Sequence, residues 1–490
     1  MDYEIVIGLE VHSQLLINSK MFCSCNAGYH DASPNTTVCP VCMGMPGVLP
    51  VINRQAIEFI IRTGLALDCT IAHHTKFDRK NYPYPDLMKG YQISQYDLPV
   101  ASKGHLTLET DEGEKTIGIT RVHMEEDVAK LFHRAEEFGE GYSLLDINRA
   151  GVALMEIVSE PDLRSADDAR TYLTQLQSIL RYIGVSNANM EEGNFRCDAN
   201  ISIRPVGEKK LGSKVEIKNM NSFRAVHGAL EYEAKRQLIA IQEGERIVQE
   251  TRGWNDANGR TFSQRVKEKE NDYRYFPEPD LPPLEISSVW IDEIERTIPE
   301  LPKARFHRFI NDLGLSEYDA ELLTSTQQMA DYFESILKAK NPSGKEVTTF
   351  AKSAGNWLVV EMGRLLNQTG DDIRSVKIEP AHMMELIDMV DSDQLSISMA
   401  KTVFEEMFNT GQAPGYIANE RGLVQISDQD ALGEAIDEAI AGNPGPVAEY
   451  LSGKEQAIRF LVGQIMKITL GKANPQLVNE LLKEKLESLR

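Results

Sequence analysis

The stretch Ile5–His12, IVIGLEVH, sets aliphatic residues in alternation with a second series that ends in Glu10 and His12. Residues two apart point to the same side of a β-strand, so this spacing predicts a strand. Glu10 and His12 then project together from a strand whose other side is aliphatic. Residues 197–204 show the same alternation, with Asp198 on the polar side. The two strands predict a sheet with one apolar face and one face that carries titratable groups.

Two helices are expected between strands of this kind. The first begins after Ser165, which is followed by Asp168 as in a capping box, and it ends at Gly184. The second runs from Ser222 to Glu243. Strands and helices do not alternate at regular lengths, which favours an α+β fold with a largely antiparallel sheet over a doubly wound fold.

Prolines cluster between residues 277 and 302 and mark a domain edge. The sequence beyond them has helical spacing, for example over residues 316–338. A further break at Gly411–Gly415 precedes a last unit. We therefore expect a sheet domain of residues 1–292, an all-helical domain of residues 293–410 and a small helical tail domain of residues 411–490.

The chain of 490 residues has a formal net charge of −22, which excludes a uniformly basic surface for DNA or RNA, so any RNA contact must be local. From Gly453 onward there are seven basic and four acidic side chains, which suits either a solvated helical surface or contact with a phosphate backbone. The first residues lack a secretory pattern, and no run of about 18 apolar residues occurs. We expect a cytoplasmic protein that does not span a membrane.

Four of the six cysteines form one block with the spacing C-x-C-x13-C-x2-C, namely Cys23, Cys25, Cys39 and Cys42. In a chain without a secretory signal this spacing favours a metal site over disulfides. Four thiolates suit tetrahedral zinc, and a site closed by four cysteines has a structural role because no position is left for a substrate. We expect Cys69 and Cys197 to be small buried residues rather than nucleophiles.

Further titratable residues lie in strand-like stretches. Glu156 and Glu216 interrupt apolar runs, and Arg121, His123 and Glu125 share one face of another predicted strand. A polar residue on the exposed face of a strand is ordinary, but a carboxylate among apolar residues is costly unless it is paired or metal-bound. Carboxylates with an imidazole are suitable ligands for magnesium or manganese, which neutralise nucleotide phosphates during phosphoryl transfer. The pattern predicts a metal site with this chemistry.

The usual nucleotide-binding and hydrolase motifs are missing from the sequence, including G-x-x-x-x-G-K-[ST], G-x-G-x-x-G after a strand, and G-x-S-x-G. If ATP binds, it must therefore bind to metals on the sheet rather than to a phosphate loop. The basic and aromatic stretch Lys76–Asp86 is a candidate for binding phosphates or an RNA end, through Arg79, Lys80 and Tyr82. A surface loop rich in proline and tyrosine is the alternative for the same residues.

Several longer strings carry a resemblance to one family. They are IGLEVH at 7–12, KFDRKNY at 76–82, HMEED at 123–127, EIVSEPD at 156–162, RCDAN at 196–200 and LVGQIM at 461–466. Together they resemble the B subunits of the tRNA-dependent glutamyl/aspartyl amidotransferases, the GatB family, over the whole chain. One departure is Ala153, where the family usually has proline, and this puts a local backbone restraint in doubt.

The resemblance implies an ATP-dependent reaction on misacylated tRNA. The side-chain carboxyl of glutamate on tRNA(Gln), or of aspartate on tRNA(Asn), is phosphorylated, and ammonia then displaces the phosphate. An amidase partner, the A subunit, supplies the ammonia from glutamine, and a small third partner, the C subunit, braces the pair in a heterotrimer. The implied fold is a cradle-shaped antiparallel sheet domain, a helical domain and a helical tail that grips the tRNA.

The resemblance also sorts the candidate catalytic residues into two metal sites. It implies that one magnesium ion is held by His12, Glu125 and Glu156. It implies that a second divalent ion is held by Glu10, Asp198 and Glu216. The cysteine block is similar to that of zinc-bearing family members. Two other functions remain open from the residues alone, a non-catalytic tRNA-binding scaffold and a stand-alone carboxylate–amine ligase acting on a small molecule.

Overall fold

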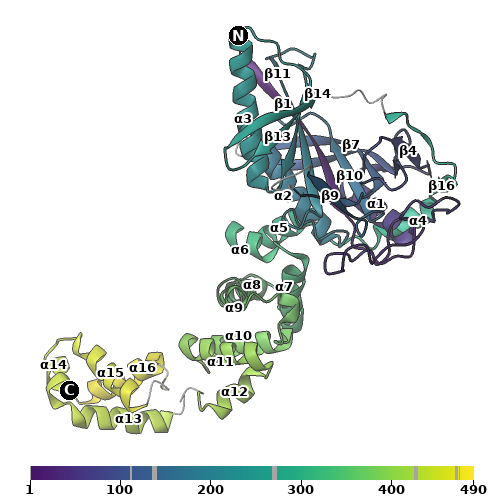
Figure 1. Cartoon of the computed structure of the whole chain (residues 1–490). Helices are drawn as coiled ribbons and strands as arrows, with labels where there is room; N and C mark the ends of the chain where they lie inside the picture. The colour runs from purple at the N-terminus through teal and green to yellow at the C-terminus, as the bar shows by residue number, and fades with distance from the viewer. Residues whose placement is uncertain are drawn as a thin grey trace. The chain divides into compact units, whose positions relative to one another are not determined.

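The computed structural model describes residues 2–110, 113–134, 141–266, 273–423, 429–469, 473 and 475–489. The chain divides into two compact units, Met1–Pro302 and Lys303–Arg490. The first contains the sheets, and the described part of the second contains helices only (Figure 1). This confirms the α+β class, whereas the division into three domains at 292 and 410 stays a prediction. No helix among the described residues is long and apolar enough to cross a membrane.

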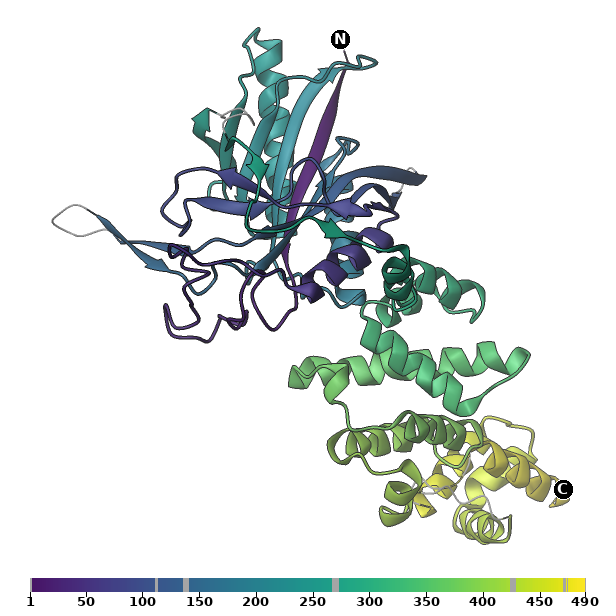
Figure 2. The same ribbon diagram turned by 90° about the vertical axis from the view of Figure 1, so that its right-hand side faces the viewer.

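A nine-stranded sheet forms the centre of the first unit, in the order β14-β13-β12-β11-β1-β10-β7-β6-β2. The strands are β1 (Tyr3–Gln14), β2 (Thr70–Ile71), β6 (Ala101–Thr110), β7 (Gly113–Glu126), β10 (Ala153–Ser159), β11 (Phe195–Pro205), β12 (Val215–Met220), β13 (Glu250–Asn255) and β14 (Arg260–Val266). Neighbours pair antiparallel except for β12 with β13. The predicted first strand therefore lies in the interior of the sheet, where Figure 2 shows it in purple among teal strands.

Helices α1 (Arg54–Ala66), α2 (Ala166–Tyr182) and α3 (Phe223–Gln242) pack against the apolar face of the sheet. Leu9 and Val11 of β1 are buried there in one core with residues of these helices. Both predicted helix starts are confirmed. The Ser165 hydroxyl accepts from the Asp168 N–H at 3.0 Å, and the Ser222 hydroxyl accepts from the Ala225 N–H at 3.1 Å. The caps satisfy backbone donors that a helix leaves unpaired at its start.

Short strands lie beside the main sheet. They are β3 (His74–Thr75) with β16 (Leu284–Glu285), β4 (Asp78–Asn81) between β5 (Tyr91–Ser94) and β15 (Phe276–Pro277), and the hairpin β8 (Lys130–Arg134) with β9 (Tyr142–Asp146). Helix α4 (Ser288–Glu295) packs on α1. Strand β5 contacts β7, so the basic stretch that contains β4 approaches the polar face of the main sheet.

The second unit consists of helices around two cores. The helices are α5 (Pro302–Asn311), α6 (Glu317–Leu323), α7 (Gln327–Lys340), α8 (Lys345–Asn356), a π-helical turn (Trp357–Met362), α9 (Gly363–Thr369), a 3₁₀ turn (Ile373–Ser375), α10 (Pro380–Asp391), α11 (Ile397–Thr410), α12 (Pro414–Glu420), α13 (Gln429–Gly442), α14 (Pro444–Leu451), α15 (Ala457–Ile468) and α16 (Pro475–Ser488). One core extends from Phe309 to Ala418 and the other from Leu432 to Leu486. Residues after the predicted break at 411 thus contribute to both cores.

The helical spacing over residues 316–338 belongs to two helices rather than one. Thr326 interrupts it, because its hydroxyl accepts from the Met329 N–H at 3.2 Å and caps a new helix. A capping residue has non-helical backbone angles and pairs with the unpaired N–H groups at the start of a helix. Helix α6 must therefore end before Thr326. Apolar periodicity alone does not show such a break.

Gly104 on β6 is needed for a close approach between segments. A Cβ atom at this position would lie 2.3 Å from Cys69 Sγ and 2.4 Å from the Leu67 carbonyl oxygen. We expect Gly104→Ala to destabilise the first unit by about 1–3 kcal/mol, because backbone must move. The matched control is Gly433→Ala on α13, which has open space around it. Chemical unfolding of both variants checks this, and an equal effect on the two would contradict it.

Candidate active site

The register of β1 arranges polar side chains in rows across the exposed face of the sheet. Glu10 lies opposite Asp198 of β11. His12 lies opposite Glu156 of β10, and Glu156 lies opposite His123 of β7. Directly opposed residues in an antiparallel pair point to the same face with their Cβ atoms about 5 Å apart. Strand pairing therefore gathers the candidate residues into one region.

The six candidate catalytic residues form two groups. In the first, one ligand atom from each of His12, Glu125 and Glu156 lies within 4.8 Å of the others. In the second, the same holds for Glu10, Asp198 and Glu216. The groups coincide with the two sets that the resemblance implies, and their role as metal ligands stays a prediction.

His123 lies between the two carboxylates of the first group. Its Nε2 is 3.3 Å from Glu156 Oε2 and 3.7 Å from Glu125 Oε1, while its Nδ1 is buried without a hydrogen-bond partner among the described residues. His12 Nε2 is also 3.3 Å from Glu156 Oε2. Two imidazoles thus flank one carboxylate. The sequence placed His123 on this face but did not assign it to the site.

Glu125 is held by residues from the small sheet above it. Ser94 Oγ donates to Glu125 Oε1 at 2.8 Å, Gln92 Nε2 donates to Oε2 at 3.1 Å, and Lys80 Nζ lies 3.3 Å from Oε1. These donors come from β5 and β4, and Figure 1 shows β4 beside the main sheet. The sequence analysis missed Gln92 and Ser94, which alternate along β5 and would be found only by recognising this short strand.

Positively charged neighbours lower the pKa values of both carboxylates in the first group. Burial raises the pKa of Glu156, but His123 and His12 outweigh it and hold that pKa well below its ordinary value. Burial likewise opposes ionisation of Glu125, yet Lys80 and His123 bring its pKa down to about 2. The pKa of His12 is raised because the attraction of Glu156 exceeds the effect of burial. Both carboxylates are therefore ionised at neutral pH, which metal binding requires.

Lys218 closes the second group. Its ammonium pairs with Asp198 and lies 3.6 Å from Glu216 Oε1. Thr251 Oγ1 donates to Glu216 Oε2 at 2.8 Å, and Asn200 Nδ2 donates to Glu10 Oε1 at 2.8 Å. Three carboxylates form an all-oxygen donor set, which suits magnesium or manganese. A divalent ion there must compete with the Lys218 ammonium for the same oxygens.

A cavity of about 210 Å³ borders the second group. Glu10 and Asn200 lie at its polar edge, and Val6, Val158 and Pro161 supply apolar walls. Asn200 Oδ1 is buried, and no described residue donates a hydrogen bond to it. An apolar cavity with a few polar groups beside charged residues is the ordinary form of a small-molecule site.

The three residues predicted to bind phosphate lie in different surroundings. Arg79 makes a two-pronged pair with Glu278, with both contacts at 2.7 Å, and its NH2 is 3.1 Å from Asp280. Lys80 Nζ instead faces the first carboxylate group, 6.0 Å from the centre of the Tyr82 ring. Lys80 and Tyr82 therefore border the candidate site, while the guanidinium of Arg79 is held by acids that are distant in sequence.

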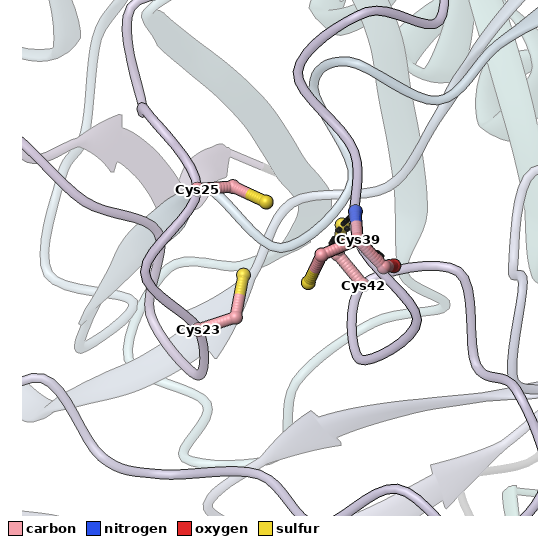
Figure 3. A group of neighbouring side chains, drawn as sticks. All are labelled: Cys23, Cys25, Cys39 and Cys42. Atoms are coloured by element: carbon pink, nitrogen blue, oxygen red, sulfur yellow. Dashed lines mark hydrogen bonds between the residues drawn. The ribbon is translucent and has the colours of Figure 1, made fainter.

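The four cysteines of the spaced block converge, as Figure 3 shows. One sulfur from each lies within 4.8 Å of the others. Lys20 is completely buried, and its Nζ is 3.6 Å from Cys42 Sγ. A hydrogen bond from Cys23, with Lys20 nearby, lowers the pKa of Cys42 to about 4. Four converging sulfurs beside a buried cation fit a metal site of four cysteines.

The remaining two cysteines lie apart from this cluster. Cys69 and Cys197 are both buried, as predicted. Burial raises the pKa of Cys69 to about 12 and that of Cys197 well above its ordinary value. Nucleophilic cysteines need a lowered pKa, so the raised pKa values agree with the expectation that these two are small buried residues.

Asp127 connects the end of β7 to three other segments. Its carboxylate accepts from Gln14 Nε2 at 2.7 Å and from Arg196 NH2 at 3.0 Å, and it lies 3.5 Å from Arg149 Nε. Its side chain is only 1% exposed. Arg196 is opposite His12 in the strand register, so this network also orders the border of the first group.

A largely antiparallel sheet that presents two groups of carboxylates beside a cavity is typical of a catalytic domain. Residues 5–292 match the GatB/GatE catalytic domain, and residues 331–486 match the GatB domain. The chain belongs to the GatB family, the B subunits of the tRNA-dependent amidotransferases.

Curated relatives cover the chain almost completely, and each is named as the B subunit of an aspartyl/glutamyl-tRNA(Asn/Gln) amidotransferase. The protein of Dehalococcoides mccartyi strain CBDB1 is 56% identical over 99% of both chains. That of Carboxydothermus hydrogenoformans is 52% identical over 100% of both. That of Thermoanaerobacter pseudethanolicus is 53% identical over 99% of this chain and 100% of the relative. These matches confirm the resemblance drawn from the sequence strings.

Removing the charge of Asp127 should be costly because two arginines depend on it. We expect Asp127→Asn to lower the free energy of unfolding by about 3 kcal/mol, since a buried carboxylate that pairs with two partly exposed arginines loses its charge. Asp292→Asn, at an exposed position of α4, is the matched control and should change it by no more than about 0.5 kcal/mol. Denaturant titration of both variants measures the difference. Equal stabilities would show that the Asp127 network contributes nothing.

Proposed function

We propose that this chain activates and amidates glutamate on tRNA(Gln), aspartate on tRNA(Asn), or both, with ATP as the phosphoryl donor. The observation that carries the proposal is the pair of carboxylate groups on one face of the sheet. Membership of the GatB family, an amidotransferase family that implies ATP use, supports it. The enzyme is thus one part of a glutamine-hydrolysing ligase.

The chemistry requires activation because a carboxylate oxygen is too poor a leaving group for ammonia. In the first step an oxygen of the substrate carboxylate bonds to the γ-phosphorus of ATP, and the bond from that phosphorus to the bridging oxygen breaks with the electron pair leaving on ADP. In the second step ammonia bonds to the acyl carbon, inorganic phosphate leaves, and a proton is lost from nitrogen. The products are the amide, ADP and phosphate.

In this scheme His12, Glu125 and Glu156 would hold one magnesium ion, and Glu10, Asp198 and Glu216 a second divalent ion. The donor sets fit, since the acids of the first group are held ionised and the second group offers only oxygens. Bound divalent ions neutralise the charge of the phosphates. Lys80 adds a positive charge beside Glu125. Burial lowers the pKa of Lys80, but the attraction of Glu125 outweighs burial and holds this pKa well above its ordinary value, so Lys80 stays protonated.

ATP itself is proposed to bind across the two groups. The cavity of about 210 Å³ beside Glu10 offers apolar walls for the base. Lys80 and Tyr82 border the first group on the other side and are candidates to contact phosphates or the acceptor end of the tRNA. Arg79 can contact a phosphate in this way only if its ion pair with Glu278 breaks.

The name of the relatives implies a complex of several subunits. We propose that the partners are the amidase A subunit, which supplies ammonia, and the small C subunit. The sequence lacks the G-x-S-x-G hydrolase motif, which agrees with ammonia being made elsewhere. The basic C-terminal residues of the tail domain, 411–490, are proposed to grip the tRNA, and the complex is proposed to act in the cytoplasm.

We further propose that Cys23, Cys25, Cys39 and Cys42 bind a structural zinc ion. Four sulfurs leave no open position for a substrate, and the loop between the two pairs has little apolar content to order it otherwise. Lys20 offsets part of the negative charge that four thiolates bring into a buried place.

Replacing Glu125 by Gln tests the catalytic assignment. It removes one charged ligand while keeping the shape, so ATP-dependent phosphorylation of mischarged tRNA should fall by at least about 100-fold. The assay measures ADP formed by the full complex with free ammonium as nitrogen source, and circular dichroism checks the fold. The control is Glu231→Gln, a half-exposed residue of α3 that pairs with Lys235 one helical turn away.

Full activity of the Glu125 variant would refute the metal assignment. A wild-type complex that binds tRNA but never turns over ATP would instead support a tRNA-binding scaffold and refute the proposed enzyme.

Elemental analysis tests the cysteine site. We expect about one zinc ion per chain after gentle purification, as for a four-cysteine structural site, and loss of that zinc in Cys42→Ser. Cys69→Ala is the control and should keep the metal, because Cys69 lies outside the cluster. Removal of zinc by a strong chelator should lower the melting temperature of the wild type but not of Cys42→Ser. A metal-free wild-type protein would refute the site.

A further inference from the structure

Arg121 lies on the catalytic face of the sheet. It alternates along β7 with Val122 and Met124, which are buried in the core, so its side chain points to the same face as Glu125. It lies opposite Val158 of β10, and Val158 lies opposite Glu10 of β1. Arg121 therefore stands in the same row as Glu10, two strands away.

The other cations that border the two carboxylate groups each have an acid as partner. Lys80 is 3.3 Å from Glu125, Arg196 is 3.0 Å from Asp127, and Lys218 pairs with Asp198. Arg121 differs from all three. Its side chain makes no hydrogen bond or ion pair with any residue that the structure describes. Its Nε is buried without a partner, as is that of Arg196, but the Arg196 guanidinium reaches Asp127 through NH2.

This arrangement is unusual on energetic grounds. A buried donor without a partner costs free energy, and a guanidinium is charged at all accessible pH values. Its neighbour across the strand pair is the apolar Val158, which cannot compensate the charge. A guanidinium that reaches solvent along an aliphatic stem is the simplest alternative. That alternative explains the exposed end of the side chain but leaves the buried Nε unexplained.

We propose that Arg121 binds an oxyanion of the reaction, either the phosphoryl group that leaves ATP or the substrate carboxylate that receives it. The inference rests on the proposed function. The planar fork of a guanidinium matches both groups with two parallel hydrogen bonds. As the oxygen–phosphorus bond to the carboxylate forms and the bond to ADP breaks, Arg121 donates hydrogen bonds to the oxygens and transfers no proton. Val158 keeps the neighbouring position free of any competing acid.

The experiment compares R121M and R121K in the full complex with the wild type. Methionine keeps much of the aliphatic stem but removes the charge, and lysine keeps the charge but loses the fork. Single-turnover phosphorylation of mischarged tRNA at saturating ATP should fall by about 100- to 1,000-fold in R121M and less in R121K. Calorimetric binding of ATP without tRNA is measured in parallel. R204K is the control. Arg204 of β11 lies on the same face of the sheet as Arg121, but it already pairs with Glu4 at 2.8 Å.

The two sources of the oxyanion give different results. Weaker ATP binding by R121M together with slower phosphorylation assigns Arg121 to the phosphoryl group. Unchanged ATP binding with slower phosphorylation assigns it to the substrate carboxylate. Wild-type rates in a folded R121M would overturn the inference and leave the proposed function intact. A wild-type complex that forms no ADP with mischarged tRNA would overturn the proposed function itself.

Discussion

The hydrogen bonding of β1 to β10 on one side and to β11 on the other holds the candidate active site together. Glu10 and His12 meet their partners only because both pairings keep one register. A shift by one residue turns every side chain of a strand to the opposite face. The aliphatic residues between them resist such a shift, because it would expose Leu9 and Val11, which are buried under the helices. Core packing and catalytic geometry therefore depend on the same strand pairings.

The carboxylates on the polar face of the main sheet also need positive charges near them. Carboxylates brought together by the strands repel one another and lose hydration, so each group needs cations nearby. The first group has His12, His123 and Lys80, and the second has Lys218. These partners come from β1, β7, β4 and β12. Because the protein supplies its own cations, the acids can be gathered on one face without any bound ion.

Sequence reasoning succeeded where the signal is local. Alternation along residues 5–12 and 197–204 predicted two strands that are present. The capping pattern at Ser165 and the helix predicted from Ser222 gave two helix starts correctly. It did not reach the contacts between segments that are distant in the chain. The guanidinium of Arg79, a candidate to bind phosphate, pairs with Glu278, which lies 199 residues away along the chain, and its binding of phosphate stays a prediction.

The sequence by itself determined which side chains face the same way, because strand geometry alternates regardless of the neighbours. It also determined the family, since long strings match over the whole chain. Only the tertiary structure decided which strands are adjacent, and hence which side chains surround the two groups of acids that the resemblance implies. It also decided which cations are neutralised and that, among the described residues, Arg121 is not. Those facts depend on contacts between segments far apart in the chain, and no local pattern encodes them.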